Sequence, residues 1–158
     1  MPPALLFDLS PLDLTADPIY DQTTINQVNP QRFEMQQLDG ILWQDTERHL
    51  ILGYKDVTDQ EFWIRGHVPA RPLMPGVIMI EAAAQLICFY TKHALGTKGF
   101  IGFGGIDSAK FRSTVVPGSR LILLAHCTKI TSRKHIFDVQ GVVDGTMVFE
   151  ATIMGLRL

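Results

Sequence analysis

One long apolar segment, residues 76–95 with sequence GVIMIEAAAQLICFYTKHAL, constrains the fold more than any other part of this chain. Pro75 stands where a first-turn proline fits, Gly96 is a suitable stop, and a helix of this length is roughly 30 Å long. Apolar residues lie on nearly every face, so we expect the helix to be buried nearly all round. Its longest nearly apolar run is too short for a bilayer and contains Glu81 and Gln85. The segment is therefore expected to be a central helix wrapped by other elements.

After residue 40, most other segments have the composition of strands. Asp144 and Gly145 predict a tight hairpin, and residues 58–60 are a candidate turn between strands on either side. The expected strands lie within residues 41–57, 61–66, 100–113, 119–130, 135–143 and 146–158. About six strands joined by short turns imply antiparallel pairing. A sheet of this kind around one long helix predicts an α+β fold.

Length and composition favour one domain and exclude several classes of protein. Residues 1–28 are rich in Pro, Asp, Thr and Asn and lack periodicity, so we expect an N-terminal extension before a domain at 29–158. The net charge of −2 and the lack of a basic stripe argue against nucleic-acid binding. Scattered histidines give no metal-binding pattern. Two cysteines and no recognisable signal peptide predict a cytoplasmic protein without a membrane span.

A candidate catalytic segment precedes the helix. His67 lies on a loop that Pro69, Pro72 and Pro75 stiffen, as a positioned side chain requires. Gly76 opens the helix with a bare amide, and unpaired amides at a helix start can stabilise a carbonyl oxygen that becomes an enolate. A base and an oxyanion donor therefore come from one short segment. The ordinary alternative is a hydrogen-bonded surface histidine.

Glu81 is a candidate proton donor inside the helix. A carboxylate among so many apolar neighbours is costly unless it is bound, and Gln85, four residues on, lies on the same face and can orient it. The alternative is a glutamate that points to the edge of the helix.

Three stretches carry a resemblance to a known family. GHVPARPLMPGVIMIEAAAQ at 66–85 resembles the signature of the FabZ-type beta-hydroxyacyl-acyl-carrier-protein dehydratases of fatty-acid synthesis. GFGGIDSAKFRSTVVPGSRLIL at 102–123 is similar to a second family segment, and NPQRFEMQQLDGIL at 29–42 to a third. The resemblance covers roughly residues 29–156.

The resemblance implies a hot-dog fold and dehydration of a (3R)-hydroxyacyl thioester to the trans-2-enoyl thioester. Its catalytic positions match His67 as base and Glu81 as acid, supplied by two subunits of a homodimer. Oxyanion donors would be the amides of Gly76 and Val77, and the carbonyl of Leu73 would orient the histidine. The family often joins three dimers into a hexamer. The substrate rides on the phosphopantetheine of acyl carrier protein, and no bound cofactor or metal is implied.

Some residues depart from the family pattern. Val68 and Ala70 replace a Phe and a Gly on the catalytic loop, and Ala70 loses the freedom of a positive φ angle. Gln31 and Glu34 replace a His and a Pro. Glu81, where a sister branch has Asp, resembles the branch that only dehydrates. The departures leave two alternatives open: a hot-dog thioesterase, or a non-catalytic subunit that binds acyl carriers or serves assembly.

Docking of the acidic carrier protein would need a basic rim at the mouth of the site. The candidates are Lys110, Arg112, Arg133 and Lys134. The alternative is a set of solvated strand ends.

Overall fold

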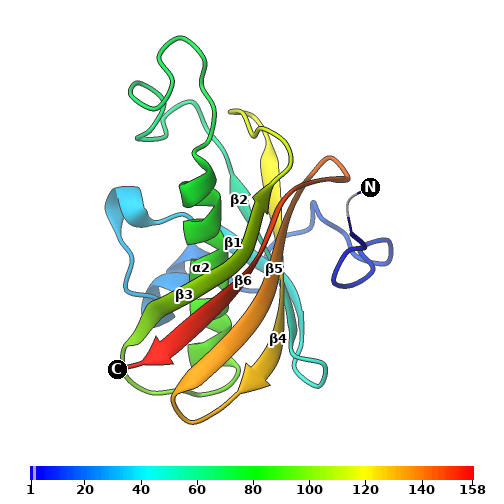
Figure 1. Ribbon diagram of the computed structural model, residues 1–158, viewed down its shortest axis with the longest axis vertical. Coiled ribbons are helices and arrows are strands. Elements are labelled where there is room, and N and C mark those ends of the chain that lie inside the picture. The colour runs from blue at the N-terminus through cyan, green and yellow to red at the C-terminus, as the bar shows by residue number, and fades with distance from the viewer. Residues whose placement is uncertain (2) are drawn as a thin grey trace.

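The computed structural model describes residue 1 and residues 3–158. The elements in chain order are α1 (Gln22–Val28), a 3₁₀ turn η1 (Phe33–Met35), β1 (Gly40–Asp45), β2 (Leu50–Asp56), α2 (Gly76–His93), β3 (Ile101–Phe111), β4 (Arg120–Ile130), β5 (Lys134–Val143) and β6 (Thr146–Arg157). The six strands form one antiparallel sheet in the order β1-β2-β4-β5-β6-β3. The sheet curves around α2, which confirms the predicted hot-dog arrangement (Figure 1).

Helix α2 is buried on most of its surface by the concave face of the sheet. Leu86, Phe89 and Tyr90 are fully enclosed and pack with inward side chains of the strands, including Leu123 and Phe137. The predicted burial on nearly every face has one exception, a stripe on which Val77 is 72% exposed and Glu81 and Ala84 are partly exposed. No helix within residue 1 and residues 3–158 is long and apolar enough to cross a membrane.

The first hairpin differs from the one expected at residues 58–60. It is formed by β1 and β2, and residues 46–49 make its turn. Residues 57–66 form turns without a strand, because their side chains bind back to the end of β2. The carboxylate of Glu61 pairs with the buried ammonium of Lys55 at 3.0 Å and accepts two hydrogen bonds from Thr58. Apolar residues suggested a strand, but one of them, Trp63, is buried as part of a compact turn.

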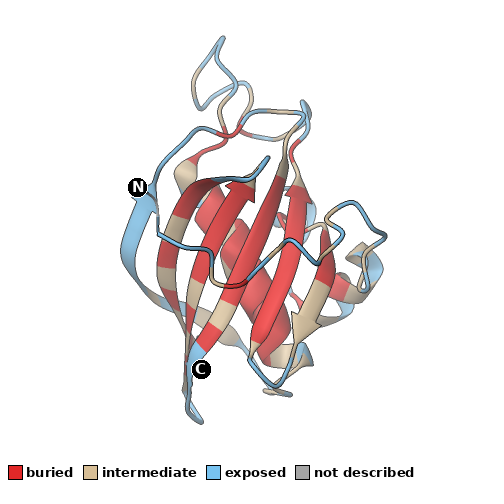
Figure 2. Ribbon diagram, turned by 90° about the vertical axis from the view of Figure 1, so that its right-hand side faces the viewer, coloured by how far each residue is buried: buried red, intermediate tan, exposed pale blue. Residues whose placement is uncertain are grey.

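The N-terminal extension lies against the convex face of the sheet (Figure 2). Phe7 packs on the outward side chains of the central strands, with its ring centroid 5.3 Å from that of Trp43. Buried Gln140 on β5 binds the backbone of the extension, accepting from the amide of Leu6 and donating to the carbonyl of Ala4. The extension therefore acts as a third layer over apolar sheet surface.

The two edges of the sheet differ in how far they are covered by other parts of the chain. At β1, Tyr20 and Ile41 form an antiparallel bridge, so the extension also pairs with this edge. At the other edge β3 is exposed over most of its length, as the pale blue strand at the left of Figure 2 shows. Its Phe103, Ile106 and Phe111 are each more than 40% exposed. This apolar edge is suited to a partner.

Candidate active site

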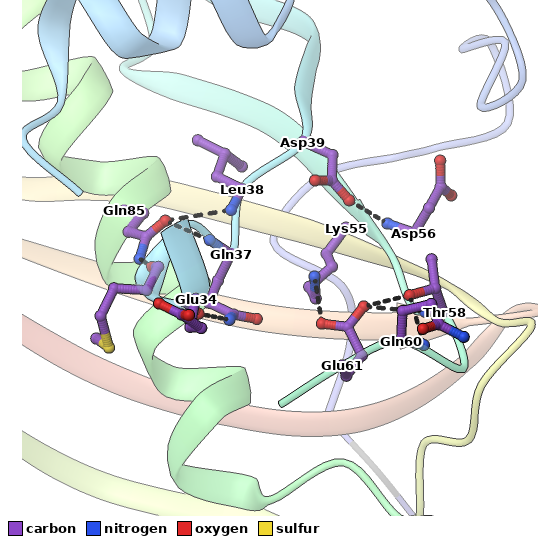
Figure 3. A network of polar contacts seen from close by, with 11 residues as sticks. Glu34, Gln37, Leu38, Asp39, Lys55, Asp56, Thr58, Gln60, Glu61 and Gln85 are labelled. Atoms are coloured by element: carbon purple, nitrogen blue, oxygen red, sulfur yellow. Dashed lines mark hydrogen bonds and ion pairs between the residues drawn. The ribbon is translucent and has the colours of Figure 1, made fainter. Parts of the chain in front are cut away.

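The loop that carries His67 is held at both ends. Before it, the Lys55–Glu61–Thr58 contacts fix residues 57–61 to the end of β2 (Figure 3). After it, the amide of Met74 donates to the carbonyl of Val115 at 2.8 Å. The histidine therefore lies on a segment that has little freedom to move relative to the sheet.

The ring of His67 has a defined tautomer. Its Nδ1 lies 2.9 Å from the carbonyl oxygen of Leu73. A carbonyl oxygen only accepts, so Nδ1 carries the hydrogen and Nε2 is left as the unprotonated nitrogen of the neutral ring. The side chain is exposed, and its Nε2 is therefore available to remove a proton from a bound molecule.

Unpaired amides lie beside the histidine at the start of α2. The carbonyl of Pro75 accepts from the amides of Ile78 and Met79, whereas those of Gly76 and Val77 form no hydrogen bond with the described residues. His67, Leu73, Gly76 and Val77 line one shallow groove with Phe111 of β3. A Cβ at position 76 would come within 2.7 Å of the Phe111 ring, so glycine is required for this packing. We call this surface the His67 groove.

Glu81 is held by a network centred on Gln85. The amide nitrogen of Gln85 donates to Glu81 Oε1 at 2.8 Å and to the carbonyl of Met35 at 2.6 Å. Its oxygen accepts from the backbone amides of Gln37 and Leu38 (Figure 3). The predicted contact between Glu81 and Gln85 is therefore present, and it ties the carboxylate to the segment that precedes β1.

Glu81 faces a second cavity, distinct from the His67 groove. We call it the Glu81 cavity. Its lining residues come from α2, β3, β5, β6 and the segment before η1: Gln31, Glu81, Ala84, Ile87, Cys88, Thr91, Ile101, Gly102, Phe103, Phe137, Ile153, Met154 and Gly155. His67 does not line it. Within one chain, the structure thus separates the candidate base and acid into two cavities.

The four predicted docking residues also lie apart within one chain. Lys110 pairs in register with Glu150, and Lys134 with Leu156, six residues further along β6. That separation along a strand is about 20 Å. Arg112 forms an ion pair with Glu150, so part of its charge is compensated.

Metal ligands are not gathered anywhere in the described part of the chain. His, Cys, Asp and Glu side chains there form no group of three or more that could hold a metal ion.

Comparison with protein families finds a match that covers most of the chain. Residues 29–152 match the model of the FabA-like domain. The chain belongs to the FabA-like family. A 3-hydroxyacyl-[acyl-carrier-protein] dehydratase FabZ from Clostridium botulinum (strain Loch Maree / Type A3) is 38% identical over 137 residues, which are 85% of this chain and 93% of that protein. The FabZ dehydratase of Desulfotalea psychrophila is 36% identical over 128 residues, or 79% and 85%.

Solved structures confirm the fold of this FabA-like chain. The dehydratase heterocomplex ApeI:P from Xenorhabdus doucetiae contains a chain that superposes with a TM-score of 0.71. The match covers 85% of this chain and 90% of that one at 13% identity, a likeness in fold alone.

Ala70 departs from the family pattern at a strained position. Its φ is +67°, in the left-handed region, which costs an L-residue about 1–2 kcal/mol relative to glycine. Replacing Ala70 by glycine would remove this cost but would also increase the conformational entropy of the unfolded chain, which reduces the net gain in stability. We expect Ala70→Gly to raise the free energy of unfolding by about 0.5–1 kcal/mol.

Chemical denaturation of both forms would measure this difference. Gly66→Ala is the control, since position 66 precedes the histidine without a positive φ and has open space for a methyl group. A lower free energy of unfolding for Ala70→Gly than for wild type would contradict the inference that the backbone of Ala70 is strained.

Two residues of the site escaped the sequence analysis. Phe111 covers Gly76, and Gln31 lines the Glu81 cavity. Gln31 departs from a family motif, but its distance of 50 positions from Glu81 in the sequence gives no sign that the two residues line one cavity. Phe111 looked like an ordinary strand residue, and only the pairing order of β3 places its ring at the start of α2.

Proposed function

We propose that this chain removes water from (3R)-hydroxyacyl thioesters carried on acyl carrier protein and forms trans-2-enoyl thioesters for acyl-chain biosynthesis. The observation that carries the proposal is His67, whose Nδ1 is engaged by Leu73 while Nε2 stays free beside two unpaired helix amides. The family and the dehydratase relatives at 36–38% identity support the same reaction. A free base next to unpaired amides can remove a proton beside a thioester carbonyl, because the amides stabilise the negative charge that develops on the carbonyl oxygen.

In the proposed reaction His67 Nε2 takes the proton from C2 of the substrate. The electrons of that C–H bond form the C2–C3 double bond as the C3–O bond breaks. Glu81, in its protonated form, donates its proton to the departing hydroxyl, which leaves as water. The amides of Gly76 and Val77 would hold the thioester oxygen, and Gln85 would orient Glu81. The thioester itself acidifies C2, so the mechanism needs no bound cofactor.

The separation of the two cavities leads us to place the site between two subunits. A two-fold axis that pairs the exposed edge of β3 with the partner's β3 is isologous and antiparallel. With the axis near the middle of the strand, the partner subunit's Phe111 lies beside Ile101 and Phe103, which line the Glu81 cavity. The partner subunit's His67 groove, which contains that Phe111, would then adjoin this chain's Glu81.

The same pairing would cover surfaces that one chain leaves open. These are the apolar side chains of β3 and the stripe of α2 at Val77, Glu81 and Ala84. We therefore propose an obligate homodimer, and the family resemblance favours three dimers in a hexamer. The proposed compartment is the cytoplasm, which two free, buried cysteines fit.

The test of the function is an assay with a 3-hydroxyacyl-carrier-protein substrate. We expect enoyl absorbance to rise, and hydration of an enoyl thioester to reverse it. A thioesterase would instead release free thiol. Tight carrier binding with neither product would indicate a non-catalytic binding subunit. Either outcome would overturn the proposal.

Carrier docking is proposed at a composite basic surface of the dimer. The proposed β3 pairing would also place the partner subunit's Lys110 and Arg112 near the C-terminal end of this chain's β6. Lys134 lies at that same end, in register with Leu156. Arg133 and Lys134 form no ion pair among the described residues. We expect Arg133→Glu with Lys134→Glu to raise KM for a carrier-bound substrate about tenfold at low salt, with a smaller effect at high salt.

Kinetics with carrier-bound and pantetheine-bound substrates would check this effect. Pantetheine thioesters lack the acidic protein, so their KM should stay unchanged. Arg48→Glu, on the β1–β2 turn, is the control for loss of positive charge. An unchanged KM for the carrier-bound substrate at low salt would remove this surface from docking.

A further inference from the structure

Gln31 has a side chain that the proposed mechanism leaves unused. It lines the same cavity as Glu81. Its Oε1 is buried and finds no hydrogen-bond partner among the described residues. A buried amide oxygen without a partner is uncommon in folded proteins, and at a substrate cavity it suggests that the ligand supplies the donor.

The backbone around Gln31 is fixed, so its side chain is presented from a rigid support. The guanidinium of Arg32 donates to the carbonyls of Asn26, Asn29 and Gln31 at 2.6–2.8 Å. The buried side chain of Asn29 donates to the carbonyl of Gln85, one turn after Glu81 on α2. Through these contacts the segment that bears Gln31 is tied to the same turn of helix that positions Glu81.

A hydroxyl group at C3 needs two different partners during dehydration. Protonated Glu81 donates to a lone pair of the hydroxyl oxygen, and the hydroxyl's own hydrogen then requires an acceptor. Gln31 lines the same cavity, and its oxygen has no other partner among the described residues, so this amide is suited to be the acceptor. We propose that Gln31 accepts a hydrogen bond from the substrate 3-hydroxyl and so aligns the C3–O bond for protonation by Glu81. The hydrogen stays with the oxygen and leaves in the water, so Gln31 exchanges no proton.

This inference rests on the proposed function and names Gln31 as the residue that recognises the hydroxyl. Because an amide does not titrate, the contact would persist across the working pH range. A substrate analogue without the 3-hydroxyl cannot make it. The contact therefore predicts that loss of the amide affects hydroxylated and saturated thioesters differently.

The experiment compares Gln31→Met, which keeps the length of the side chain, with wild type. We expect kcat/KM for the 3-hydroxyacyl thioester to fall about 10- to 100-fold, the usual cost of a lost buried hydrogen bond. The inhibition constant of the saturated acyl thioester of equal length should change less than about threefold, since that ligand has no hydroxyl. Gln44→Met is the matched control: its Oε1 is also buried and unpartnered, but it lies on β1 and does not line the cavity.

The outcomes separate this inference from the proposed function. Equal losses for both ligands would show that Gln31 only shapes the cavity, and an unchanged kcat/KM would exclude any role. Both results overturn the inference while wild-type dehydration leaves the proposed function standing. A wild-type protein without dehydration activity would instead remove the function itself.

Discussion

Replacing His67 by alanine should slow dehydration about 10²–10⁴-fold, the usual contribution of a positioned acid or base. The imidazole is exposed, and its one hydrogen bond among the described residues is to the carbonyl of Leu73, so the variant should keep its fold. Glu81→Gln should cause a loss of the same order because an amide cannot protonate the leaving hydroxyl. Its oxygen can still accept from Gln85, which preserves the local network.

Steady-state turnover of a 3-hydroxyacyl-carrier-protein substrate would measure both losses. His126→Ala is a control histidine variant, since His126 lies on β4 away from both cavities. Thermal unfolding of each variant would exclude a general loss of structure. Turnover within a few-fold of wild type in either site variant would remove that residue from the mechanism.

Mixing the two inactive variants should restore activity if the sites are shared between subunits. A mixed dimer of His67→Ala and Glu81→Gln chains holds one site with both native groups and one with neither. Random exchange makes half of the dimers mixed, so about one quarter of wild-type activity should return. Relative to parents reduced 10²-fold or more, that is a gain of at least about 25-fold.

Subunit exchange must be verified separately, for example by mass spectrometry of chains that carry tags of different mass. A double variant, His67→Ala with Glu81→Gln in the same chain, should give no recovery when mixed with either single variant. Background activity in a verified mixture of the single variants would contradict the shared site. His67 and Glu81 would then belong to one chain's pocket.

Local sequence patterns predicted the elements whose determinants are local. The apolar run and its flanking Pro75 and Gly96 placed α2, and Asp144-Gly145 placed the last hairpin, where both residues adopt positive φ. The strand expected at residues 61–66 was wrong because the contact between Lys55 and Glu61 fixes a turn instead. Alternation of side chains cannot reveal such an ion pair.

The candidate site was predictable only where a continuous motif carries it. His67, Leu73 and Gly76 lie within ten positions, and the structure places them in one groove. The Glu81 cavity combines α2 with three strands and a segment before η1, so Gln31 and Phe103 could not be assigned to it from spacing. The role of the N-terminal extension was equally hidden, since Phe7 contacts residues more than 30 positions away.

The unequal edges of the sheet affect how far the sheet itself can be extended by added copies. A sheet with two free edges can add copies at both ends and grow into an open ribbon. Here the bridge between Tyr20 and Ile41 covers the β1 edge at one point with the chain's own extension, whereas β3 is exposed over most of its length. In the proposed dimer the two β3 edges pair with each other, so the two β1 edges, each with its bridge to the extension, form the ends of the continuous sheet. The extension thus acts as a partial cap on the outer edge of the sheet, and a protein trimmed of residues 1–20 would lose the Tyr20–Ile41 bridge and expose that edge.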